Sequence, residues 1–180
     1  MKTSKQMLKW AMILVFIISV GPVKAQAPYN QGIGVTVGTF FGPTYKTFLK
    51  DKMALQVDFG VKFNTVNDAL GVVWDLEVNP NLLYQSPIGT GGLYWFAGGG
   101  LSIGYAFAQT YKLWGITNND YFNMGKAGLN VMAGLEYQFR NIPLSLQFDF
   151  RPGCGVYFAT HSDPWFSFDW VLGLGVKYTF

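Results

Sequence analysis

The chain of 180 residues is half hydrophobic and 18% aromatic, and only 13% of its residues are charged. Four of its 13 basic residues are lysines within residues 1–25, so the remainder holds 9 basic and 10 acidic residues, a net charge of −1 that gives nucleic-acid binding no electrostatic support. The only cysteine, Cys154, cannot form an internal disulfide.

The first 25 residues have the layout of a secretory signal peptide. A lysine-containing start precedes an apolar run over residues 10–21, which at 12 residues is shorter than the roughly 20 that a transmembrane helix needs. Compact residues stand at the −3 and −1 positions of the Ala25–Gln26 bond, so cleavage is expected there. We predict a signal peptide over residues 1–25 and a single domain over residues 26–180, with a retained N-terminal anchor as the alternative.

After the signal peptide, apolar and polar residues alternate, and no apolar run is long enough for a spanning helix. In the clearest segment, residues 53–63, Leu55 and Val57 fall on one face and Gln56 and Asp58 on the other. A period of two is typical of a strand whose two faces meet different surroundings. The pattern recurs and predicts eight strands, over residues 31–39, 43–49, 53–63, 70–84, 93–108, 126–140, 144–158 and 165–180.

The placement of charge separates two all-β architectures. On the six clearest strands the apolar face carries no charge, and the charged residues lie on the opposite face. A soluble sandwich, the alternative, would have a core overloaded with Trp and Phe, whereas in a membrane barrel these aromatics form interfacial girdles. We therefore predict an all-β fold, an eight-stranded antiparallel up-and-down transmembrane β-barrel.

An eight-stranded barrel has an interior just wide enough for side chains to fill. Unpaired buried charges would cost several kcal/mol each, so we expect paired ions in the lumen and no water channel. The expected lumen ionic network consists of Lys46, Asp58, Lys62, Asp75, Glu77, Glu136, Arg140, Asp149, Arg151, Asp169 and Lys177.

Connection lengths predict the orientation of the barrel, because membrane barrels have periplasmic termini, short periplasmic turns and longer outer loops. The expected periplasmic turns are residues 50–52, 85–92 and 141–143, and the expected outer loops are residues 40–42, 64–69, 109–125 and 159–164. The longest loop, 109–125, contains Tyr111, Trp114 and Tyr121. Exposed aromatics suit recognition, so this loop is the expected contact surface for a ligand or partner.

The last predicted strand ends in Gly175-Val-Lys-Tyr178-Thr-Phe180. This sequence resembles the C-terminal assembly signal of bacterial outer-membrane barrels. The whole of residues 26–180 is similar to small outer-membrane barrels of the OmpA-transmembrane or OmpX type, most clearly at residues 42–55, 95–100, 134–137 and 142–149. The resemblance implies outer-membrane localisation, contact with outer-membrane lipid and with the barrel assembly machinery, and a structural or surface-interaction role. We expect a monomer with no cofactor.

One cluster has residue types that could carry chemistry: His161, Ser162 and Asp163, which include the only histidine. Some small outer-membrane barrels are lipid A acylases or deacylases that use such groups. Adjacent loop residues rarely reach the geometry of a nucleophile with its base, and Asp163-Pro164 is typical of a turn. We therefore predict no enzyme activity and no metal site. A lipid A-modifying enzyme and a narrow small-solute channel are the alternatives.

Overall fold

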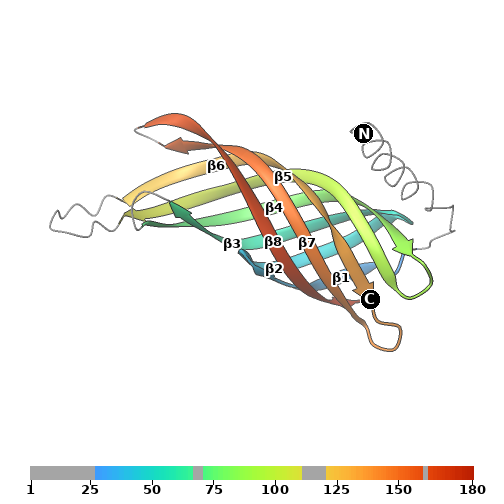
Figure 1. Ribbon diagram of the computed structural model, residues 1–180. Coiled ribbons are helices and arrows are strands. Elements are labelled where there is room, and N and C mark those ends of the chain that lie inside the picture. The colour runs from blue at the N-terminus through green and yellow to red at the C-terminus, as the bar shows by residue number, and fades with distance from the viewer. Residues whose placement is uncertain (1–26, 67–70, 111–120, 160–161) are drawn as a thin grey trace, which may run out of the picture.

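The computed structural model describes residues 27–66, 71–110, 121–159 and 162–180. These residues form eight antiparallel strands in one closed barrel (Figure 1), which confirms the predicted fold class. The strands are β1 Gln31–Gly38, β2 Phe40–Lys50, β3 Met53–Val66, β4 Gly71–Ile88, β5 Leu93–Thr110, β6 Tyr121–Gln138, β7 Leu144–Ala159 and β8 Ser162–Thr179. In the described part of the chain, no helix is long and apolar enough to cross a membrane.

The ring closes where β1 pairs with β8. Backbone hydrogen bonds of 2.8 Å join Gln31 and Phe180 in both directions at this seam. We call this end of the barrel the terminal end. It also carries the β2–β3, β4–β5 and β6–β7 turns, two of which lie beside the C-terminus in Figure 1. The opposite end is called the distal end.

Alternation along each strand sends polar side chains inward and apolar side chains outward. Buried polar or charged residues outnumber buried hydrophobic ones among the described residues. The outer surface is a continuous apolar wall, to which Val35, Leu82, Phe148 and Leu174 contribute from four different strands, each about half exposed. The fold is therefore inverted relative to a water-soluble domain, whose apolar face is buried.

The prediction of an outer loop at residues 40–42 is wrong, because these residues are the first three of β2. Phe40 is fully buried inside the barrel while Phe41 faces outward, so the alternation starts directly after Thr39. The turn is this tight because β8 supports it: Thr39 donates its N–H to the Leu172 carbonyl (3.1 Å), and the Leu172 N–H donates to Thr39 Oγ1 (3.0 Å).

Several other predicted connections are shorter in the structure; the outer loops predicted at 64–69 and 159–164, for example, overlap β3 and β8. The turn predicted at 85–92 occupies only residues 89–92, because Gly89 (φ 67°) and Gly92 (φ 84°) alone supply the left-handed conformations that reverse the chain. The ends of the predicted loop 109–125 belong to β5 and β6, where Gln109 pairs with Tyr121. The alternation pattern could not predict these strand ends, because a strand end that meets water on both faces carries polar residues without apolar alternation.

Candidate functional site

The lumen is the candidate functional site, because almost all charged side chains of the strands meet there. Three clusters follow one another along the barrel axis. The terminal cluster contains Tyr29, Lys46, Gln85, Glu136, Gln147 and Lys177; the central cluster contains Gln56, Asp58, Asp149 and Arg151; and the distal cluster contains Lys62, Asp75, Glu77, Lys126 and Asp169.

In the terminal cluster, one carboxylate serves two lysines. Glu136 Oε2 lies 2.6 Å from Lys46 Nζ, and Glu136 Oε1 lies 3.6 Å from Lys177 Nζ. All three side chains are fully buried. Each lysine also donates a hydrogen bond to a glutamine side chain, Lys46 to Gln85 Oε1 (2.5 Å) and Lys177 to Gln147 Oε1. Because the cluster holds two cations and one anion, Glu136 is the group on which both lysines depend.

An apolar group lies beside the terminal cluster inside the barrel. Leu83, Phe96 and Met132 form one buried hydrophobic cluster. Lys46 Nζ lies 4.9 Å from the centroid of the Phe96 ring, within range of a cation–π interaction. These side chains fill lumen volume that water would otherwise occupy.

Tyr29 lies at the terminal end of the lumen, where it borders an open cavity of about 610 Å³ between the turns, and sequence reasoning missed it because it precedes the first alternating segment. Its hydroxyl donates to Glu136 Oε1 at 2.6 Å, and its ring packs edge-on against Phe48 with centroids 5.2 Å apart. Burial and the neighbouring carboxylate raise the pKa of Tyr29 well above its ordinary value. The phenol therefore remains a hydrogen-bond donor to Glu136 throughout the neutral and mildly alkaline range.

Replacing Tyr29 with phenylalanine is expected to destabilise the barrel by about 1.5–3 kcal/mol, the contribution of a hydrogen bond to a charged group. The ring would keep its contact with Phe48, while the buried carboxylate would lose a donor. Urea unfolding in lipid vesicles would measure the difference. The matched control is Tyr45→Phe, since Tyr45 donates to Gln31 Oε1 (3.0 Å) on the exposed surface and should shift stability by less than about 0.5 kcal/mol. Equal effects of the two substitutions would contradict a special role for Tyr29.

The central cluster is built around one arginine. Arg151 Nη1 lies 2.8 Å from Asp58 Oδ2, and Arg151 Nε lies 2.6 Å from Asp149 Oδ1. Each carboxylate also accepts from a glutamine, Asp58 from Gln56 (3.2 Å) and Asp149 from Gln147 (3.0 Å). Gln147 therefore contacts both the terminal and the central clusters. Because two carboxylates share one guanidinium, the central cluster has an excess negative charge.

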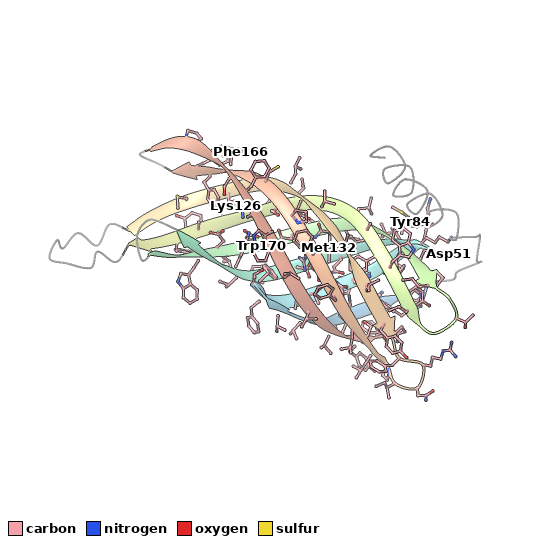
Figure 2. The ribbon with its side chains drawn as sticks, viewed as in Figure 1. Asp51, Tyr84, Lys126, Met132, Phe166 and Trp170 are labelled. Atoms are coloured by element: carbon pink, nitrogen blue, oxygen red, sulfur yellow. The ribbon has the colours of Figure 1, made fainter. Side chains whose placement is uncertain are left out.

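The distal cluster has Lys126 at its centre, in the distal half of the barrel (Figure 2). Lys126 donates to Glu77, and its Nζ lies 2.6 Å from Asp169 Oδ2 and 3.6 Å from Asp75 Oδ2. Lys62 Nζ lies 2.6 Å from the same oxygen of Asp169. Three carboxylates thus surround two ammonium groups contributed by β3 and β6.

The structure places ten of the eleven predicted lumen residues inside the barrel; Arg140 is the exception. Arg140 has the parity of an inward-facing residue, but β6 ends at Gln138, so Arg140 lies on the exposed turn and donates to the Thr90 carbonyl. The network instead contains Lys126, which the predicted set did not include. Lys126 has the same parity as Glu136, so alternation alone was a sufficient signal to find it.

The packed network leaves little free space. Lys46, Asp58 and Glu136 have no accessible surface, whereas the lining of an open channel would be exposed. A void between the central and distal clusters, bordered by Arg151 and Asp169 among others, has about 10 Å³ of accessible space. This is room for about one water molecule. The interior is chemically a paired polar core.

The remaining predicted sites are placed as follows. Gly175 faces the lumen in β8, Tyr178 faces outward, and Phe180 forms the seam with β1. The catalytic candidates His161, Ser162 and Asp163 lie outside the part of the chain whose side chains the structure describes. The predicted cleavage bond between Ala25 and Gln26 and the centre of the predicted contact loop, residues 111–120, also lie outside the described residues.

The closed antiparallel ring of eight strands is a fold that solved outer-membrane proteins share. A major outer membrane protein from Thermus thermophilus is similar, with a TM-score of 0.55 at 12% identity over 83% of this chain and 98% of that one. The N-terminal β-barrel domain of OprF from Pseudomonas aeruginosa also matches, with a TM-score of 0.46 at 17% identity over 83% of this chain and 95% of that domain. No protein-family model and no curated protein sequence matches the chain. At such low identity, the likeness to the solved structures concerns the fold.

Proposed function

We propose that the protein is an integral outer-membrane β-barrel with a structural and surface-interaction role. The observation that carries this proposal is the inverted distribution of side chains, with lysines, carboxylates and an arginine buried inside and an apolar wall outside. Contiguous exposed apolar patches on soluble monomers rarely exceed a few hundred Å², and here the apolar surface encircles the barrel. Lipid is the solvent that such a wall fits. Where the barrel meets hydrocarbon, a closed ring of strands leaves no sheet edge with unpaired backbone groups.

The closed lumen favours this role over solute transport. Each of the three clusters is held by ion pairs of 2.6–2.8 Å between different strands, so opening a path would require several of them to break. Contacts with partners are then left to the connections at the distal end, which face the exterior if the terminal end faces the periplasm. The longest connection of the barrel, residues 111–120, belongs to the distal end, whereas the longest turn at the terminal end comprises five residues, 139–143, and this difference supports the orientation.

Fractionation of the cell envelope tests the location. The protein should sediment with the outer membrane, and its folded form should migrate differently from the boiled form in a denaturing gel. Recovery in the soluble periplasmic fraction would contradict the proposal. Planar-bilayer recording tests the closed lumen separately, with no conductance steps expected. Regular steps from folded protein would favour the channel alternative while leaving the membrane location intact.

A further inference from the structure

Among the described residues, the lysine and arginine side chains without an ion pair lie at one end of the barrel. In the described ranges there are eight lysine and arginine side chains, and five of them form ion pairs inside the lumen. The other three, Lys50, Lys52 and Arg140, have no ion pair among the described residues and lie at terminal-end turns. Each is therefore available to an anion from outside the protein.

Lys52 extends over an outward-facing aromatic pair. Its Nζ lies 5.9 Å from the centroid of the Tyr84 ring. Tyr84 contacts Trp95 of the neighbouring strand, with ring centroids 5.6 Å apart and planes tilted by 47°. Figure 2 shows Tyr84 of β4 near Asp51, which belongs to the β2–β3 turn with Lys52, at the terminal end of the barrel. Tyr and Trp prefer the headgroup level of a membrane, so this pair marks the height at which a lipid phosphate would lie.

The apolar wall continues from the Tyr84–Trp95 pair toward the middle of the barrel. Leu55 of β3 and Leu82 of β4 are paired in register and both face outward. The next outward pair is Val57 and Pro80. A strip of hydrocarbon surface thus runs away from the cationic turn, as the acyl chains of a lipid run away from its headgroup.

We propose that the β2–β3 turn and the Tyr84–Trp95 pair bind an anionic glycerophospholipid of the leaflet at the terminal end. Lys52 and Lys50 attract the phosphate, the aromatic rings pack against the glycerol region, and the acyl chains lie along β3 and β4. Asp51 lies between the two lysines and opposes them, so the turn has a net charge of +1. The inference rests on the proposed membrane location and adds a lipid preference to it.

The preference can be measured at the site by fluorescence quenching. A variant that retains Trp95 alone, with the other tryptophans (Trp10, Trp74, Trp114, Trp165 and Trp170) replaced by phenylalanine, would be folded into vesicles of phosphatidylcholine and phosphatidylglycerol. Brominating one lipid at a time gives the relative association constant of each lipid at Trp95. One net positive charge near a membrane surface corresponds to about a five-fold preference for the anionic lipid. The preference should fall at high salt, because exposed charges are screened.

Charge variants of the turn supply the test. Lys52→Gln should lower the preference about five-fold, to near unity, and Asp51→Asn should raise it about five-fold. A second reporter that retains only Trp170, which lies on β8, should be insensitive to Lys52→Gln. Equal quenching of Trp95 by both lipids, unchanged by either substitution, would overturn the proposed site while supporting a membrane location. Absence of quenching by either lipid would overturn the membrane location itself. Native mass spectrometry of the unmodified protein, comparing retained phosphatidylglycerol with retained phosphatidylcholine, gives the same comparison if the single-tryptophan variants do not fold.

Discussion

Replacing Glu136 with glutamine is expected to destabilise the barrel by about 3–5 kcal/mol, the largest effect of any single charge substitution in the lumen. The substitution keeps the shape of the side chain but leaves Lys46 and Lys177 buried without their shared counter-ion. An uncompensated buried charge is costly because the interior lacks water to solvate it. Urea unfolding in vesicles, followed by the shift between folded and unfolded bands, would measure the loss.

The terminal cluster also predicts an asymmetry between its members. Lys177→Met removes one of two cations that share a single carboxylate, so it should cost much less than Glu136→Gln, since apolar replacement of a buried ion is often close to neutral. Asp51→Asn, on an exposed turn without an ion pair among the described residues, serves as the control and should shift stability by less than about 0.5 kcal/mol. If Lys177→Met proved as costly as Glu136→Gln, an excess positive charge in the cluster would be ruled out.

Phe148→Arg should destabilise the protein by about 2–4 kcal/mol in lipid vesicles. Phe148 faces outward, is 48% exposed and is the fifth residue of β7. At a rise of about 3.3 Å per residue and a tilt of about 40°, five residues climb about 12 Å, half of an apolar band about 25 Å tall. The arginine would therefore enter the middle of the bilayer. The same substitution on the surface of a soluble sandwich would be nearly neutral, so this result separates the two architectures.

The control for Phe148→Arg is Ile142→Arg. Ile142 is similarly exposed, at 46%, but belongs to the β6–β7 turn at the terminal end. An arginine at the edge of the bilayer reaches the headgroups and should cost about 0–1 kcal/mol. Equal costs at the two positions would mean that the apolar wall does not meet a bilayer of this depth. Folding efficiency in vesicles of different thickness would then indicate where the wall does meet lipid.

Sequence alternation predicted which face each strand residue occupies, and the reason is geometric. A strand has a period of two, so one correctly assigned charge, such as Glu136, fixes the parity of the whole strand. Parity does not determine where a strand ends, and for this reason Arg140 was predicted inside although it lies on a turn. Lys126 is a different case: it is the first residue of the predicted strand over 126–140 and has the parity of Glu136, so alternation would have placed it in the lumen although the predicted network omits it.

The partners within the lumen were not predictable from alternation. Lys126 of β6 contacts Glu77 of β4 and Asp169 of β8, and these contacts cross the interior between strands that are not neighbours. Such pairs depend on the register of every strand between them, and an error of one residue in any register would change them. The position of Tyr29 in the lumen could not be predicted for a different reason. A single side chain that precedes the first strand belongs to no alternating pattern.

The unequal heights of the strands limit how deeply the barrel can lie in a bilayer. β1 has 8 residues and β8 has 18, and their register stops at Gly38 opposite Gly173. After the bonds between Thr39 and Leu172, the N–H groups of Trp170 and Phe168 point to the side where β1 has ended, and in the described part of the chain no strand receives them. Hydrocarbon would leave these amides unsatisfied at several kcal/mol each, whereas water or headgroups would bond them. The outer boundary of the hydrocarbon layer is therefore expected near the level of Thr39, so the shortest strand, about 20 Å in height, sets the immersion depth of the whole molecule.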